Sequence, residues 1–116
     1  MTQGGTERRR AARATAEFPI QLTDLGGARA ANLRDISTNG LCCLYPEAIR
    51  EMTKVRIDLQ LPGLTASMPV EGVVVRCDKL RGRTPAAYEI GIYFTDVPAA
   101  VRAALGDFVA ANLPTT

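Results

Sequence analysis

Apolar and polar residues alternate along most of the chain, which is the period-2 pattern of half-buried β-strands. The alternation is clearest over residues 54–61, where four aliphatic side chains alternate with charged or amide side chains. Turn-forming pairs separate the alternating segments, among them Pro62-Gly63 and Asn39-Gly40. Asn39-Gly40 is a strong turn signal because both residues tolerate a positive φ. Six strands are predicted in this way, over residues 17–23, 28–36, 41–45, 54–61, 65–77 and 87–94.

Two of these strands carry further information. In the strand over 28–36, Ala31, Leu33 and Asp35 share one phase of the alternation, so we expect them on one side. In the strand over 65–77 the phase slips near Gly72. A slip at a glycine indicates a β-bulge or a bend such as barrels contain.

The period changes after the last strand. Apolar residues then recur at the spacing of one helical face, namely at Val101, Leu105, Phe108, Val109 and Leu113. We therefore predict a helix over 97–113, with Asp96 as its N-cap and Pro98 in its first turn. Gly106 inside this helix costs about 1 kcal/mol relative to alanine, so the helix must gain stability by docking. A single helical turn is also expected over 46–50.

These elements predict one mainly β domain: a six-stranded antiparallel β-barrel with a C-terminal α-helix. The chain of 116 residues, 47% of them hydrophobic, is long enough to bury a core as one domain. Residues 1–6 and 114–116 are expected to be tails. No segment approaches the roughly 20 apolar residues of a membrane span, and residues 1–6 lack the apolar core of a signal peptide. We therefore expect a cytoplasmic protein without membrane insertion.

The three cysteines, Cys42, Cys43 and Cys77, show no repeating spacing. An odd number of cysteines without a repeating spacing argues against a disulfide framework. Because the chain has no histidine, a zinc site is improbable. We expect structural thiols, with Cys42 and Cys43 on opposite faces of a strand.

The composition also argues against an enzyme. Without histidine the commonest general base is missing. Ser37 has no partner base at a recognisable spacing, the acidic residues form no pair, and no phosphate-binding loop of the P-loop type occurs. We therefore expect no catalytic residues, no cofactor and no metal.

Charge is concentrated near the N-terminus. The net charge is only +2, but residues 7–13 hold Arg8, Arg9, Arg10 and Arg13 against a single acid, Glu7. Such a cluster attracts phosphates whatever the total charge. If the segment forms one helical turn, Arg9 and Arg13 share a side.

The loop Asp35-Ile36-Ser37-Thr38-Asn39-Gly40 supplies a complementary set of groups. Asp35 is an acceptor suited to the N1–H and amino group of guanine, and Ser37 both donates and accepts. Gly40 allows backbone to approach a ligand closely. A guanidinium binds phosphate bidentately, pairs with guanine O6 and N7, or stacks on a base. Each feature alone has an ordinary reading, as a solvated tail or a common turn; together they favour a guanine nucleotide.

The same residues resemble the motifs of the PilZ domain, a bacterial receptor module for cyclic di-GMP. Arg9-Arg10-Ala11-Ala12-Arg13 is similar to the family's RxxxR motif, and Asp35 to Gly40 is similar to its [D/N]xSxxG motif. Residues 72–76 and 88–94 resemble the family's fifth and sixth strands. The resemblance extends from Glu7 to about Leu113.

The resemblance implies a barrel with both motifs at one end. It implies that Arg9 and Arg13 hold guanine and phosphate, that Asp35 and Ser37 read a guanine edge, and that Gly40 shapes the turn. Arg8 and Arg10 are implied as additional phosphate contacts. Because the chain has no tryptophan, we expect arginine rather than an aromatic ring to stack on the purine.

The expected function is a cyclic di-GMP receptor that orders residues 7–13, here called the basic arm, over the barrel and signals to a separate effector protein. One alternative is a PilZ-like adaptor that binds a protein and no nucleotide. A second is a small-barrel binder of single-stranded nucleic acid, a class that needs basic grooves and exposed aromatics. Aromatics make up only 5% of the chain and fall mostly on apolar faces, so we expect no DNA or RNA partner.

Overall fold

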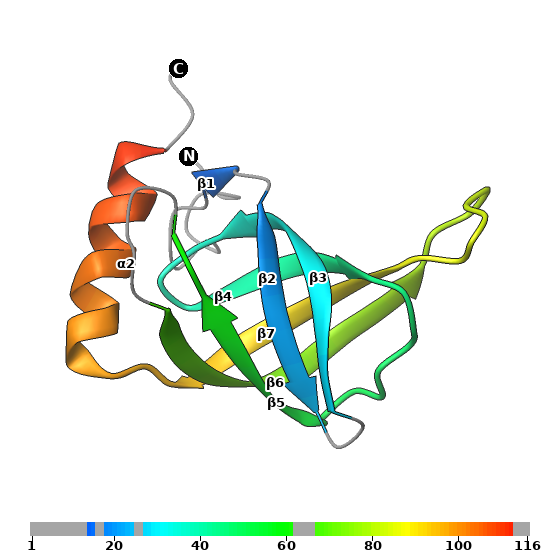
Figure 1. The fold of residues 1–116 in the computed structure, drawn as a ribbon, viewed down its shortest axis with the longest axis horizontal. Helices are drawn as coiled ribbons and strands as arrows, with labels where there is room; N and C mark the ends of the chain where they lie inside the picture. The colour runs from blue at the N-terminus through cyan, green and yellow to red at the C-terminus, as the bar shows by residue number, and fades with distance from the viewer. Residues whose placement is uncertain (1–13, 16–17, 25–26, 62–66, 113–116) are drawn as a thin grey trace, which may run out of the picture.

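The computed structural model describes residues 14–15, 18–24, 27–61 and 67–112. These segments form strands and one helix (Figure 1). The elements are β1 (Ala14–Thr15), β2 (Pro19–Asp24), β3 (Gly27–Ile36), β4 (Gly40–Tyr45), β5 (Lys54–Leu59), β6 (Met68–Lys79), β7 (Tyr88–Asp96) and α2 (Ala99–Ala111).

The strands form one antiparallel sheet that closes on itself. Their order is β1-β3-β2-β5-β6-β7-β4, and a further pairing between β3 and β4 joins the two ends. The short β1 pairs with β3 at Asp35 and Ile36, beyond the part of β3 that β2 covers. The predicted six-stranded antiparallel barrel with a C-terminal helix is confirmed.

The barrel interior is the hydrophobic core. Strands β2, β5 and β7 turn alternate side chains inward, as their sequence patterns predict. The largest fully buried side chains in the described segments are Leu22, Leu33, Ile36, Leu41, Ile57, Leu59, Leu61, Ile90, Leu105, Val70, Val74 and Cys43. The cysteine prediction is also confirmed, since Cys42 and Cys43 are buried, Cys77 is half-buried and all three thiols are free.

Helix α2 docks on the barrel through the predicted stripe. Val101, Leu105 and Val109 are buried within the barrel's own core cluster. Phe108 meets the ring of Phe18 edge to face, with centroids 5.9 Å apart. No helix in the described segments is long and apolar enough to cross a membrane.

The predicted start of this helix is wrong. Asp96 is the last residue of β7, and Pro98 occupies the N-cap without a side-chain capping bond. The first intrahelical bond runs from the Arg102 N–H to the Pro98 carbonyl. The β-strand continues to Asp96 because Asp96 still pairs with Glu71 of β6. Leu113, the last residue of the predicted stripe, lies outside the described residues.

The predicted helical turn over 46–50 is also wrong. The connection between β4 and β5 contains no helix and turns instead at Glu51 and Met52, where Met52 has a φ of 72°. The backbone of this connection hydrogen-bonds to β6. The Met52 N–H donates to the Val74 carbonyl at 2.7 Å, and the Val74 N–H donates to the Thr53 carbonyl at 2.9 Å. Pairing with a strand competes with helix formation here.

Three register shifts interrupt two strand pairs, and two of these shifts lie next to the candidate site. The predicted bulge near Gly72 is confirmed as a register shift between Glu71 and Gly72. Its extra residue is Thr95 of β7, however, and burial along β6 alternates through Gly72 without the predicted phase slip. A second shift lies between Val74 and Arg76 of β6, and a third lies between Leu33 and Asp35 of β3. Because a bulge inserts one unpaired residue, it turns the side chains that follow it to the other face.

Candidate ligand-binding site

The third bulge corrects the expected position of Asp35. Ala31 and Leu33 are buried as predicted, but Asp35 is half-buried and Ile36 takes the next core position. Arg34 is the unpaired residue, since Leu33 pairs with Cys43 and Asp35 pairs with Cys42. The bulge therefore takes Asp35 out of the core face, and its carboxylate lines a surface pocket.

Ser37 holds the loop that follows Asp35. Its side chain is fully buried, and its hydroxyl accepts hydrogen bonds from the N–H groups of Asn39 at 3.1 Å and Gly40 at 3.2 Å. The hydroxyl lies 3.3 Å from the Gly40 carbonyl, to which it donates, and the Ser37 N–H donates to the same oxygen. These bonds fix the predicted turn. The predicted contact between Ser37 and a guanine edge would require some of them to be released.

Gly40 is required for a reason that differs from the one predicted. Neither Asn39 nor Gly40 is among the described residues with a positive φ. Instead, a Cβ on Gly40 would overlap the carbonyl oxygen of Ile92. The absence of a side chain therefore lets the start of β4 lie close against β7, where the Phe94 N–H also donates to the Asn39 carbonyl at 2.8 Å.

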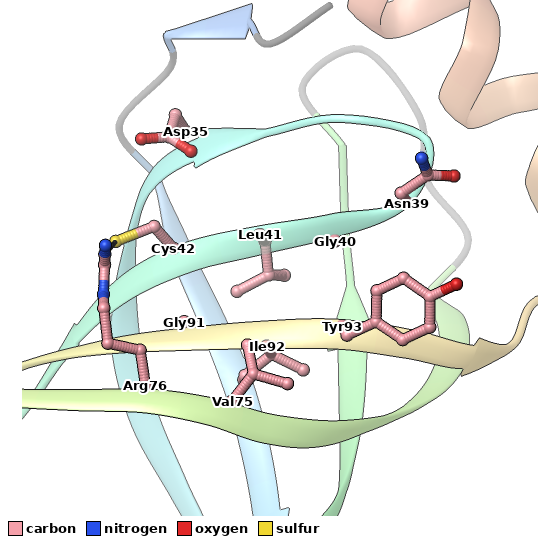
Figure 2. Close-up of a pocket in the computed structure, with 10 residues that line it drawn as sticks. All are labelled: Asp35, Asn39, Gly40, Leu41, Cys42, Val75, Arg76, Gly91, Ile92 and Tyr93. Atoms are coloured by element: carbon pink, nitrogen blue, oxygen red, sulfur yellow. Dashed lines mark hydrogen bonds between the residues drawn. The ribbon is translucent and has the colours of Figure 1, made fainter. Parts of the chain in front are cut away.

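The loop borders a pocket of about 600 Å³ on the outer wall of the barrel, here called the Asp35 pocket (Figure 2). Residues of β3, β4, β6, β7 and the Ser37 loop contribute to it. The lining residues are Asp35, Asn39, Gly40, Leu41, Cys42, Val75, Arg76, Gly91, Ile92 and Tyr93.

The β6 bulge supplies two consecutive residues to this pocket. Val74 pairs with Ile92 and Arg76 pairs with Gly91, so Val75 is the unpaired residue. As a result both Val75 and Arg76 are exposed, whereas a regular strand would turn one of the two inward. The bulges on β3 and β6 therefore place Asp35, Val75 and Arg76 around one pocket.

Arg76 is held at one end of the pocket. Its Nε lies 3.3 Å from Asp78, and one terminal nitrogen lies 3.6 Å from Glu89. The same nitrogen lies 3.6 Å from the Cys42 sulfur, an approach visible in Figure 2. The Arg76 side chain is half exposed, and ion pairs of this kind contribute only about 0.2–1 kcal/mol. The contacts therefore orient the guanidinium without preventing it from binding a ligand.

The thiol of Cys42 lines the pocket as an uncharged group. Burial raises the pKa of Cys42 to about 11, and the negative charges of Glu89 and Asp35 act in the same direction. The thiol therefore stays protonated at neutral pH and contributes packing and a weak acceptor rather than a charge.

Tyr93 forms the other end of the pocket, near Asn39 (Figure 2). It is 55% exposed, and its register partner on β4 is Gly40. An aromatic ring is therefore available beside the loop, although the expectation that arginine stacks on the purine stays a prediction. The sequence signal was present: Tyr93 lies between Ile92 and Phe94, at a position of β7 that the alternation turns toward water.

The structure brings together the three predicted loop residues, Asp35, Ser37 and Gly40. Arg8, Arg9, Arg10 and Arg13 lie outside the described residues. Arg13 is nonetheless bonded to Ala14, and Ala14 pairs with Ile36 while Thr15 pairs with Asp35. The basic arm therefore joins the described structure beside the strand that carries Asp35.

The pocket combines groups that suit a planar, polar heterocycle. Asp35 accepts hydrogen bonds, Arg76 donates them, and Tyr93 offers an aromatic surface. Sequence reasoning singled out neither Arg76, Val75 nor Tyr93 as a site residue. Arg76 and Val75 could not be assigned from alternation because a bulge sets their direction.

Comparison with known proteins agrees with these observations. The family model of the PilZ domain matches residues 7–111. No curated protein sequence matches the chain. Among solved structures, the PilZ domain of Escherichia coli YcgR, determined with c-di-GMP, is 16% identical with a TM-score of 0.69. That alignment covers 90% of this chain and 91% of the YcgR domain.

Longer proteins contain a similar fold. The Bacillus subtilis inhibitor of motility MotI/DgrA is 18% identical with a TM-score of 0.74 over 90% of this chain and 50% of its own. Borreliella burgdorferi PlzA, solved in complex with c-di-GMP, is 13% identical with a TM-score of 0.64 over 90% of this chain and 42% of its own. The chain thus spans about half or less of the length of these two proteins.

Proposed function

The chain belongs to the PilZ domain family, and on that premise we propose that it is a receptor for cyclic di-GMP which binds its ligand in the Asp35 pocket. The observation that carries the proposal is the joining of the two sequence motifs. Ala14, the residue after Arg13, pairs with Ile36, and Asp35 beside it lines the pocket. The presence of c-di-GMP in the structures of YcgR and PlzA supports the choice of ligand.

The loop residues have distinct roles in this proposal. Asp35 accepts the N1–H and amino hydrogens of one guanine. The main role of Ser37 is to hold the loop in shape, because its hydroxyl accepts hydrogen bonds that fix the position of Asn39 and Gly40. Gly40 keeps β4 against β7 and leaves the pocket floor open.

The arginines of the arm balance the ligand's charge. Cyclic di-GMP carries two phosphate charges, and guanidinium groups bind phosphate bidentately. Arg9 and Arg13 hold phosphate and guanine, and Arg8 and Arg10 add phosphate contacts. Closing the arm over the ligand costs on the order of 2–5 kcal/mol of the interaction energy in ordering.

Closure of the arm also provides the signal. A bound ligand orders the arm and so changes the surface that another protein meets, which is a disorder-to-order switch. We place the receptor in the cytoplasm, where an effector protein reads this surface. The effector would recognise the arm and ligand together, so its affinity for the receptor would depend on cyclic di-GMP.

Isothermal titration calorimetry tests the proposal. Cyclic di-GMP should give saturable heat, and cyclic di-AMP should not, because adenine offers Asp35 no N1–H donor. Single-stranded RNA should also fail to bind. An absence of heat and of NMR shifts at high cyclic di-GMP concentration would refute the proposal and favour an adaptor that binds no nucleotide, whereas RNA binding would favour the nucleic-acid alternative.

A further inference from the structure

Tyr93 differs from the other aromatic side chains of the chain. All six phenylalanines and tyrosines lie in the described segments, and of these only Tyr93 is exposed. The other five are buried or half-buried among apolar residues. Val75, another of the large exposed hydrophobic residues, lines the same pocket. Apolar surface is thus concentrated where a ligand is proposed to bind.

Two of the residues next to Tyr93 on the outer face of the sheet are glycines. Its register partner on β4 is Gly40, which has no side chain and cannot acquire one without overlapping Ile92. Two residues back along β7, on the same face, is Gly91. Gly91 pairs with Cys42 and Arg76. The floor beside Tyr93 is therefore the backbone of Gly40 and Gly91, and the side chains of Arg76 and Val75 lie against Gly91 at its far side.

Tyr93 and Asp35 reach the pocket from strands that are two places apart in the sheet. Asp35 is on β3 and Tyr93 is on β7, with β4 between them. Since neighbouring strands lie about 4.8 Å apart, the two backbones are about 10 Å apart before their two-residue offset along β4 is added. Figure 2 shows the two side chains at opposite ends of the pocket.

We propose that Tyr93 is a stacking platform for one guanine of the ligand, while Asp35 reads the edge of the other. This inference rests on the proposed function, because it assigns the two bases of cyclic di-GMP to two ends of one pocket. Stacking tolerates any base because every base has a π-face, and it is often worth tenfold or more in affinity. Edge recognition at Asp35 would then supply the preference for guanine.

Fluorescence and affinity measurements on variants test the proposal. The chain has no tryptophan and three tyrosines, so its emission comes from tyrosine. Binding of cyclic di-GMP to the unaltered chain should quench part of this emission through contact with Tyr93. Tyr93→Phe should keep its affinity within about threefold and lose that quenching, whereas Tyr93→Ser should bind about 5- to 100-fold more weakly. Met52→Ser, which removes another exposed apolar side chain outside the pocket, should change nothing.

The double variant Asp35→Asn/Tyr93→Ser tests the assignment to separate bases. If the residues contact different guanines, the two fold-losses should multiply. Normal affinity of Tyr93→Ser would overturn the platform, and losses that fail to multiply would overturn its assignment to a separate base. If the unaltered chain does not bind cyclic di-GMP, the proposed function fails as well, and that outcome is distinct from both.

Discussion

Ala14 is the register partner of Ile36, one residue from Asp35. The pairing connects the end of the basic arm to the strand that presents the pocket carboxylate. The two motifs are about twenty residues apart in the sequence, and β2 and most of β3 separate them along the chain. The barrel brings the ends of that segment together, which is why neither motif alone specifies a site.

The arm arginines should contribute to affinity and not to stability. Arg9→Ala or Arg13→Ala should weaken cyclic di-GMP binding at least about tenfold, because each removes a charge-assisted contact. The melting temperature should be nearly unchanged. Arg102→Ala, which removes a charge from the exposed face of α2, is the matched control. An equal loss in all three variants would show that only total charge matters.

Ser37→Ala should lower the free energy of unfolding by about 1–3 kcal/mol, because the N–H groups of Asn39 and Gly40 lose a buried acceptor. Urea denaturation measures the change. Thr38→Ala in the same loop should cost less than about 0.5 kcal/mol, since Thr38 is only half-buried. Similar losses in the two variants would contradict the role given to the Ser37 hydroxyl.

Two glycine substitutions should act in opposite directions. Gly106→Ala should stabilise the protein by about 0.5–1 kcal/mol, since a Cβ there meets nothing within 4 Å and alanine favours the helix. Gly40→Ala should destabilise it, because the new Cβ overlaps the Ile92 carbonyl. Thermal unfolding of both variants gives the signs, and a stabilising Gly40→Ala would show that β4 and β7 can separate freely.

The buried thiols predict a loss of stability at alkaline pH. Burial raises the pKa of Cys42 to about 11 and that of Cys43 to about 12 from an ordinary 9.0. The unfolded chain therefore releases these protons first, and the free energy of unfolding should fall as pH rises from about 9 toward 11. Each thiol contributes up to about 1.4 kcal/mol per pH unit in this range.

Cys43→Ala tests that pH dependence. The variant should show a shallower fall in the free energy of unfolding above pH 9 and the same slope as the unaltered chain between pH 6 and 8. Denaturant titrations at a series of pH values provide both slopes. Identical alkaline slopes would mean that the Cys43 thiol ionises as readily in the folded protein as in the unfolded chain.

Alternation alone predicts most of this fold, because the inward residues of a barrel strand must be apolar. It gives the strand containing Val55, Ile57 and Leu59 and the helical stripe at Val101, Leu105 and Val109. Alternation does not predict the residues at which strands and helices begin and end. Aspartate is a common N-cap residue, yet pairing with Glu71 keeps Asp96 in a strand. Such tertiary pairing cannot be predicted from the local sequence.

The site is less predictable than the fold, since bulges determine its side-chain directions. Strict alternation predicts that Asp35 lies on the same face of β3 as Leu33. Because Arg34 is unpaired, Asp35 instead turns to the outer face. In the same way Val75 and Arg76 face the pocket together because of a bulge. Tyr93 was accessible to sequence reasoning, since its outward phase on β7 leaves an aromatic ring unexplained by the core.

The central claim is that the arm and the loop are two halves of one cyclic di-GMP site. Calorimetric titration of cyclic di-GMP into three full-length chains tests it most directly: the unaltered protein, Arg9→Ala/Arg13→Ala and Asp35→Asn. The account predicts saturable binding by the first, with losses of at least about a hundredfold for the double arginine variant and about tenfold for Asp35→Asn. Absence of binding by the unaltered chain, or undiminished binding by either variant, would contradict it.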